Sequence, residues 1–277
     1  MKNFLVIGNP VDHSLSPKLH REIYRQLGIE ASYEKLELKE KKIPEILAKL
    51  KAGDLHGINV TIPYKETILR LLDDIAPKAK NIGSVNCVSI HADKVTGHNT
   101  DSVGFTNVLG LRQVPIAGQH FVVMGAGGSA RSVVYALLRS MAGKVTVINR
   151  TDKRAAKLIS DMKPFNESTS LITSPIDAID TSVPLTWINC TPLGMGSLQE
   201  KSPVPIDYIQ SNHHVMDLVY QPLRTTFIKE ADRKNANVIT GLDLLIEQGL
   251  ESCRIWFGRD ISSEVTRSLL ISSLLIG

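Results

Sequence analysis

Residues 122–130, Val-Val-Met-Gly-Ala-Gly-Gly-Ser-Ala, join an apolar run to a glycine-rich turn. The run 120–124 is typical of a buried strand, and the residues after the turn, to about Met141, favour a helix. In the pattern Gly-x-Gly-x-x-Ala, the first glycine permits a tight turn, the second lets the backbone approach a pyrophosphate, and the small last residue lets helix and strand pack closely. The helix N-terminus offers unpaired N–H groups to the phosphates. We therefore predict a dinucleotide-binding turn, with a plain strand–helix turn as the alternative. Its residues are Gly125, Ala126, Gly127, Gly128 and Ser129.

The end of the next predicted strand, residues 144–149, indicates which dinucleotide is bound. Sites for NAD usually carry an acidic residue here, which binds the ribose 2′-hydroxyl. This strand ends at Asn149 instead, and Arg150 and Arg154 follow. Because arginine matches the geometry of a phosphate and stays charged, we predict NADP, although Asp152 could offset Arg150 in part. A solvated basic helix start is the alternative, and it is disfavoured because cations oppose the dipole at a helix N-terminus.

Strand and helix patterns alternate along both halves of the 277-residue chain, a length that suits two domains. In the second half, predicted strands at 185–189 and 214–217 follow the glycine turn, which is a doubly wound layout. The first half favours a mainly parallel sheet. Its predicted strands are 4–7, 33–38, 57–61 and 85–90, and its predicted helices are 16–27, 43–50 and one from about 65. A helical tail starts at Leu242 and includes the apolar run 269–276.

The bulk composition excludes several classes of protein. The net charge of +4 is small, and acidic residues interrupt the one weak basic cluster, so we expect no nucleic-acid partner. The three cysteines, Cys87, Cys190 and Cys253, are far apart and form no CxxC pair, which argues against a disulfide framework or a metal site. No apolar run reaches the ~20 residues that span a membrane, and the first run is too short for a signal peptide. We expect a cytoplasmic protein with no membrane partner, and the sequence leaves monomer and homodimer open.

Polar residues cluster where predicted strands end or helices begin in the first half of the chain. Ser14 and Ser16 stand where the helix 16–27 starts, and hydroxyls beside helix N–H groups suit a carboxylate. Ser16 could equally be only the N-cap, with Pro17 next and Gly28 ending the helix. Further candidates, each ambiguous alone, are Thr61, Lys65, Asn86 and Asp101.

Nine blocks, taken in order, carry a resemblance that covers both halves of the chain. They are GNPVDHSLSPKLH at 8–20, GINVTIPYKE at 57–66, GSVN at 83–86, GHNTDSVGF at 97–105, GAGGSA at 125–130, INRTDKR at 148–154, NCTPLGM at 189–195, DLVYQP at 217–222 and GLDLLIEQG at 241–249. With these blocks the chain resembles the shikimate dehydrogenase family from end to end. The resemblance implies an α/β protein of two domains. An N-terminal α/β substrate domain, residues 1–101 plus 241–277, would be completed by the C-terminal helices. A doubly wound Rossmann NADP-binding domain would span residues 102–240.

The resemblance also implies an activity and the residues that carry it. The activity is the reversible NADPH-dependent reduction of 3-dehydroshikimate to shikimate, on the route to chorismate and the aromatic amino acids. By similarity, Lys65 and Asp101 are the catalytic pair. The implied substrate-binding residues are Ser14, Ser16, Thr61, Asn86, Tyr220 and Gln248. The implied cofactor-binding residues, besides the glycine turn, are Asn149, Arg150, Thr151, Arg154, Thr191, Leu218 and Gly241.

Three rival functions stay open. A quinate/shikimate dehydrogenase of relaxed substrate or cofactor choice would share most of these residues. A folate-type dehydrogenase with a similar two-domain plan would not need the pair Ser14 and Ser16. A non-catalytic dinucleotide-binding sensor would have no reason to keep Lys65 and Asp101 together.

Overall fold

The computed structural model describes residues 1–275 and separates the chain into two compact units, residues 1–104 with 246–277 and residues 105–245. Ile276 and Gly277, the end of the predicted substrate domain and of the predicted terminal helix, lie outside the described residues. No helix within residues 1–275 combines the length and the apolar character needed to cross a membrane.

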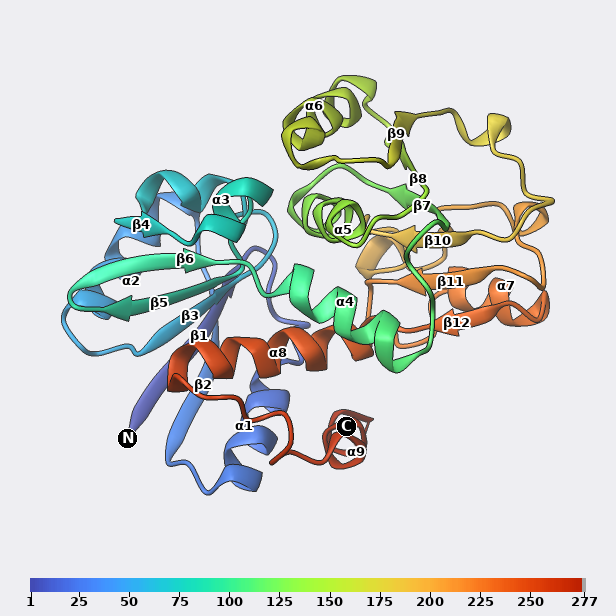
Figure 1. The fold of residues 1–277 in the computed structure, drawn as a ribbon. Helices are drawn as coiled ribbons and strands as arrows, with labels where there is room; N and C mark the ends of the chain where they lie inside the picture. Colours follow the sequence, from blue (N-terminus) through green and yellow to red (C-terminus); the bar gives the residue numbers. More distant parts are fainter. Residues whose placement is uncertain (276–277) are drawn as a thin grey trace. The chain divides into compact units, whose positions relative to one another are not determined.

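The first unit is built on a six-stranded sheet of order β2-β1-β3-β5-β6-β4 (Figure 1). Its strands are β1 (Lys2–Gly8), β2 (Ala31–Glu37), β3 (Gly57–Val60), β4 (Asp74–Ile75), β5 (Cys87–His91) and β6 (Lys94–His98). Its helices are α1 (Ser16–Leu27), α2 (Ile43–Lys51), α3 (Pro77–Ile82) and α9 (Arg267–Leu275), with 3₁₀ turns at Glu40–Lys42 and Thr67–Leu71. Helices α4 (Asp101–Leu111) and α8 (Gly241–Phe257) contribute one end to this unit and continue into the other.

Side chains along β1 point alternately to the two faces of the sheet, and each face carries part of the core of the first unit. Phe4 stacks on Trp256 of α8, with ring centroids 4.6 Å apart, and also contacts Tyr24 of α1. Ile7 points to the opposite face and packs with residues of α2 such as Leu47. Because successive side chains of a strand point to opposite faces, this short apolar strand holds helices on both sides of the sheet.

Four details of the first unit differ from the sequence prediction. The sheet is mixed, because β5 pairs antiparallel with both β3 and β6. The β5–β6 hairpin turns at Ala92 and Asp93, which both have positive φ and lack the Asn-Gly or Asp-Gly pair that marks such turns. The predicted helix from about residue 65 is instead the 3₁₀ turn Thr67–Leu71. Ser16 is not the N-cap of α1, since Leu15 occupies that position and no side chain caps the helix there.

The second unit is an all-parallel sheet of order β12-β11-β10-β7-β8-β9, which runs from green to orange in Figure 1. Its strands are β7 (His120–Met124), β8 (Lys144–Ile148), β9 (Ser170–Thr173), β10 (Thr186–Asn189), β11 (His214–Asp217) and β12 (Asn237–Ile239). Its helices are α5 (Gly128–Arg139), α6 (Asp152–Met162) and α7 (Thr226–Arg233), with 3₁₀ turns at Lys163–Phe165, Ile176–Ala178, Gly196–Leu198 and Ile206–Tyr208.

The strand order of the second unit reverses between β7 and β10, so ligands are expected at the carboxyl ends of these two strands. Val123 packs with Leu137 of α5 on one face, and Val122 packs with Phe227 of α7 on the other. Strands buried on both faces explain the near-continuous apolar runs seen in the sequence. The doubly wound fold predicted from the glycine turn is confirmed.

Candidate active site

The loop after β3 carries Thr61 and Lys65 and is held by close backbone packing. An added Cβ on Gly8 would lie 2.5 Å from Thr61 Cγ2, so glycine at the end of β1 is what lets the loop approach. The backbone N–H of Tyr64 donates to the Thr61 carbonyl at 3.0 Å, and that of Val85 donates to the Lys65 carbonyl at 2.8 Å. The backbone from which the Thr61 and Lys65 side chains project is therefore fixed by hydrogen bonds.

Lys65 and Asp101 form a close ion pair in the first unit. Lys65 Nζ donates to Asp101 Oδ2 at 2.6 Å, and the two side chains are 14% and 9% exposed. Asp101 Oδ1 accepts a second bond, at 2.8 Å, from the amide of Asn86. Charges this far from water need such additional hydrogen bonds. The arrangement presents an ammonium group, with its orientation fixed by a carboxylate, for use in acid–base chemistry.

Asn86 connects the ion pair of Lys65 and Asp101 to the start of α4 and to α8. Its amide nitrogen also donates to Thr100 Oγ1 at 2.9 Å, and its Oδ1 accepts from the Thr100 backbone N–H at 2.7 Å. Thr100 Oγ1 in turn lies 3.4 Å from Gln248 Oε1 and donates to it. Four predicted site residues, Lys65, Asp101, Asn86 and Gln248, therefore belong to one hydrogen-bonded group.

Further polar residues, which were not predicted from the sequence, form hydrogen bonds and ring contacts behind this group. Asn59 donates to the Asn86 carbonyl and to Ser252 Oγ, both at 3.0 Å, and accepts from the Tyr33 hydroxyl at 2.7 Å. His20 stacks on Tyr33 with ring centroids 4.1 Å apart. Burial lowers the pKa of His20 to about 3, so this imidazole is neutral. A polar residue inside an otherwise apolar strand, as Asn59 is in β3, was the available clue.

The serine pair lies at the start of α1. Ser14 Oγ accepts from the backbone N–H of Ser16 at 3.3 Å, and Ser16 is 7% exposed. This contact is local, so it does not link the serine pair to the ion pair of Lys65 and Asp101. The N-cap residue Leu15 makes no side-chain cap bond, and Ser14 holds only the first N–H of α1, so the start of this helix remains suited to an anion.

In the second unit, the glycine turn follows β7 at the strand-order reversal. Gly125 has φ +113°, a conformation that favours glycine, and a Cβ there would lie 3.1 Å from the Cys190 carbonyl oxygen. Gly127 is the N-cap of α5 and leaves open space where a Cβ would stand. No side chain caps α5, and its first turn carries no acid. These features fit a bound pyrophosphate. The other predicted members of this turn are Ala126, Gly128 and Ser129.

The turn after β8 carries the predicted 2′-phosphate site. Asn149 Nδ2 donates to the Thr151 carbonyl at 2.9 Å, which shapes the turn, and Thr151 is the N-cap of α6. Arg150 is exposed and forms no ion pair with any residue between 1 and 275. Arg154 lies in the first turn of α6. An exposed guanidinium at a turn without a strand-end acid fits the extra phosphate of NADP.

The remaining cofactor candidates lie in the loops after β10 and β11 and at the start of α8. Thr191 Oγ1 donates to Asn189 Oδ1 at 2.7 Å. A Cβ on Gly241 would lie 2.5 Å from the Leu218 carbonyl oxygen, so these two residues are in close contact. Tyr220, a predicted substrate contact, lies half-buried in the loop after β11.

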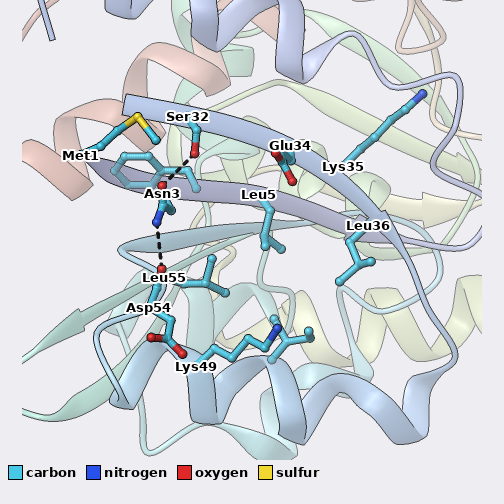
Figure 2. A pocket seen from close by; sticks show the side chains of 12 residues that line it. Met1, Asn3, Leu5, Ser32, Glu34, Lys35, Leu36, Lys49, Asp54 and Leu55 are labelled. Atoms are coloured by element: carbon cyan, nitrogen blue, oxygen red, sulfur yellow. Dashed lines mark hydrogen bonds between the residues drawn. The ribbon is translucent and has the colours of Figure 1, made fainter. Parts of the chain in front are cut away.

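A surface cavity and the cysteines are not part of the predicted site. A cavity of about 610 Å³ at the β1–β2 edge of the first sheet is lined by Leu5, Leu36 and Leu55 together with polar residues, and by none of the predicted site residues (Figure 2). Within residues 1–275 no group of three or more His, Cys, Asp or Glu side chains could hold a metal ion. Among the described residues no cysteine forms a disulfide, and Cys87 and Cys253 are buried.

The parallel sheet with its glycine turn, together with a separate α/β unit that carries the buried Lys65–Asp101 pair, defines a two-domain α/β protein with a Rossmann-type nucleotide-binding unit. Three family models match it. They are described as the shikimate dehydrogenase substrate binding domain (residues 6–88), shikimate / quinate 5-dehydrogenase (109–182) and the shikimate 5′-dehydrogenase C-terminal domain (241–271).

Relatives and solved structures agree with these models. Shikimate dehydrogenase (NADP(+)) of Pyrococcus furiosus is 36% identical over 277 aligned residues, covering 99% of this chain and 96% of the relative. The shikimate 5-dehydrogenase of Thermus thermophilus, solved in complex with NADP(H) and shikimate, has a TM-score of 0.87 at 34% identity, covering 99% and 98%. A shikimate dehydrogenase solved in complex with NADP+ has a TM-score of 0.88 at 30% identity, covering 99% and 95%. The chain belongs to the shikimate dehydrogenase family.

Proposed function

We propose that this chain catalyses the reversible NADPH-dependent reduction of 3-dehydroshikimate to shikimate, a step toward chorismate and the aromatic amino acids. The observation that carries the proposal is the buried ion pair of Lys65 and Asp101, 2.6 Å apart, in a chain whose relatives bear this activity in their names. A buried ion pair is weak evidence of a stabilising role, since well-packed apolar residues of similar volume often stabilise a core as well. It is suited to moving a proton.

The reaction needs a hydride and a proton. Bound NADPH supplies the hydride to the keto carbon, and that carbon's C=O π electrons move to oxygen. We assign Lys65 Nζ as the group that stabilises the resulting alkoxide and donates the proton, because it is a hydrogen-bond donor oriented by Asp101. Asp101 Oδ2 orients the ammonium, and Asn86 orients Asp101. In the oxidation direction the same pair receives the proton.

The remaining assignments follow the family resemblance and the local chemistry. We assign residues 1–101 plus 241–277 to substrate binding and residues 102–240 to NADP binding. Substrate would be held by Ser14, Ser16, Thr61, Asn86, Tyr220 and Gln248. The cofactor would be held by the glycine turn with Asn149, Arg150, Thr151, Arg154, Thr191, Leu218 and Gly241. We further propose a cytoplasmic enzyme, monomeric or homodimeric, which fractionation and sedimentation would test.

An absorbance assay at the nicotinamide band tests the function. Pure protein with shikimate and NADP+ should form NADPH, and replacing NADP+ by NAD+ should lower the rate strongly. Comparable rates with quinate or NAD+ would favour a dehydrogenase of relaxed choice. Absence of shikimate-dependent reduction, with NADP+ still bound, would favour a non-catalytic sensor and refute the proposal.

A further inference from the structure

A buried carboxylate lies at the end of β11 in the second unit, outside the residues assigned above. Asp217 is fully buried. Its Oδ1 accepts from Asn189 Nδ2 at 2.8 Å and from the Val219 backbone N–H at 3.0 Å, and its Oδ2 accepts from Thr225 Oγ1 at 2.6 Å. Both oxygens are therefore satisfied by donors from three different segments.

Asn189, at the end of neighbouring β10, extends the same network into the loop 191–195. Its Oδ1 accepts from the backbone N–H of Thr191 at 3.0 Å and from its hydroxyl at 2.7 Å. Its Nδ2 also donates to the Leu193 carbonyl at 3.0 Å. Asn189 thus fixes both sides of this loop, and it is itself held by Asp217.

Thr225 extends the network on the other side of Asp217. Thr225 Oγ1 accepts from the Ile228 backbone N–H at 3.2 Å as the N-cap of α7. A Cβ on Gly194 would lie 3.0 Å from Thr225 Cγ2, so the loop 191–195 packs directly on this threonine. One polar network therefore fixes the loop after β10, the loop after β11 and the start of α7 relative to one another.

A buried charge is a costly way to stabilise a fold, so its position calls for a further reason. Burial raises the pKa of Asp217 to about 6, while the hydrogen bonds from Thr225, Val219 and Asn189 oppose that rise. The neighbouring strands β7 and β8 end in the apolar residues Met124 and Ile148 instead. By contrast, the strands β10 and β11, which lead into the loops that carry Thr191 and Leu218, end in the polar residues Asn189 and Asp217.

We propose that Asp217 is a positioning residue that holds the loops 191–195 and 218–220 in the conformation that receives the nicotinamide half of the cofactor. Within the proposed function, this inference rests on the cofactor assignment alone, because that assignment places these loops beside the nicotinamide. Asp217 acts through Asn189 and the Val219 N–H rather than by touching the cofactor. The adenosine half, bound at the turn after β8, is independent of this network.

Calorimetric binding to the full chain separates the two halves of the cofactor. NADP+ probes both halves, whereas adenosine 2′,5′-bisphosphate lacks the nicotinamide. Asp217→Asn places an amide nitrogen against hydrogen-bond donors, and we expect it to weaken NADP+ binding at least tenfold while the bisphosphate stays within twofold of wild type. Unchanged NADP+ binding, or an equal loss for both ligands, would overturn the inference.

The pair Thr225→Ser and Thr225→Val repeats the test if Asp217→Asn does not fold. Serine keeps the hydroxyl and should keep NADP+ binding, and valine should lose it selectively. Equal NADP+ binding by the two variants would overturn the inference. If wild-type protein binds both ligands but shows no shikimate-dependent turnover, the proposed function fails while this inference stands. If wild-type protein does not bind NADP+, both fail.

Discussion

Asp101 uses one carboxylate oxygen for Lys65 and the other for Asn86, so each member of the catalytic group has a fixed partner. Rigid hydrogen-bonded groups of this kind can hold a proton donor where charge develops on substrate, without reorganisation during the reaction. At the scale of the residue, Lys65 is therefore proposed to carry the proton-transfer chemistry, and its neighbours Asp101 and Asn86 orient it.

Lys65→Ala should lower kcat by about 10²–10⁴, the usual size of an acid–base contribution, with little change in KM for shikimate. Steady-state kinetics measures both constants, and thermal unfolding provides the control, since the variant should remain folded. A folded variant with near-normal kcat would remove Lys65 from the mechanism.

Arg150→Ala should raise KM for NADPH about tenfold or more, because a hydrogen bond to a charged group contributes roughly 1.5–3 kcal/mol. KM for NADH should not change, since NADH has no 2′-phosphate. Lys153→Ala, a change at an exposed residue of α6 just after the turn that carries Arg150, is the matched control and should have little effect. A change of less than twofold in KM for NADPH would refute the assignment of Arg150.

At the scale of the element, α4 and α8 approach closely where Gly104 meets Gln248. A Cβ on Gly104 would lie 2.9 Å from the Gln248 backbone nitrogen and 3.2 Å from its Cα. On the same helix, Gly110 has open space at the corresponding position. The two glycines of α4 therefore serve different purposes, and only the first sets where Gln248 lies relative to Asp101.

Gly104→Ala should raise KM for shikimate several-fold and destabilise the fold by about 1–3 kcal/mol, the usual cost of overpacking. Gly110→Ala should stabilise the fold by roughly 0.5–1 kcal/mol through helix propensity and leave KM unchanged. Denaturant unfolding and steady-state kinetics check both variants. Wild-type KM and stability for Gly104→Ala would contradict the contact.

At the scale of the whole molecule, buried His20 couples stability to pH. Its ring is surrounded by Tyr33, Tyr24, Trp256 and the Cys253 thiol, none of them charged at neutral pH. Burial lowers its pKa from 6.5 to about 3 in the folded state. Below pH 6.5 the unfolded chain therefore binds a proton that the folded chain does not, and stability falls as the pH falls.

Wild-type protein should lose about 1 kcal/mol more of unfolding free energy per pH unit than His20→Gln between pH 6 and 4. Other titrating groups, including Asp217, occur in both proteins and cancel in the difference. Denaturant unfolding at several pH values measures the two slopes. Parallel curves would contradict the burial of a neutral His20.

The sequence predicted the elements whose formation depends on a few neighbouring residues. The strands His120–Met124 and His214–Asp217 and the end of α1 at Gly28 agree with the prediction, because apolar runs and left-handed glycines act over a few residues. The hairpin at Ala92 was missed because its sequence lacks a strong turn pattern, and the helix predicted from about residue 65 was wrong, since that segment is a short 3₁₀ turn.

The candidate site required contacts that no local pattern carries. Asn59 and Ser252 are 193 residues apart in the chain, and Asn86 bonds Asp101 across a hairpin. Their residue types are common in loops and helices, so the family resemblance, rather than spacing, singled out Lys65, Asp101 and Asn86. Asp217 and Asn189 escaped notice because each ends a buried strand and resembles an ordinary start of a loop.

The central claim is that a hydride passes from NADPH to the keto carbon of 3-dehydroshikimate. Its most direct test is reduction of 3-dehydroshikimate by the pure protein with NADPH that carries deuterium at both C4 positions, followed by mass spectrometry of the product. We expect shikimate that carries one deuterium on the carbon that bore the ketone. Absence of shikimate, or shikimate without deuterium, would contradict it.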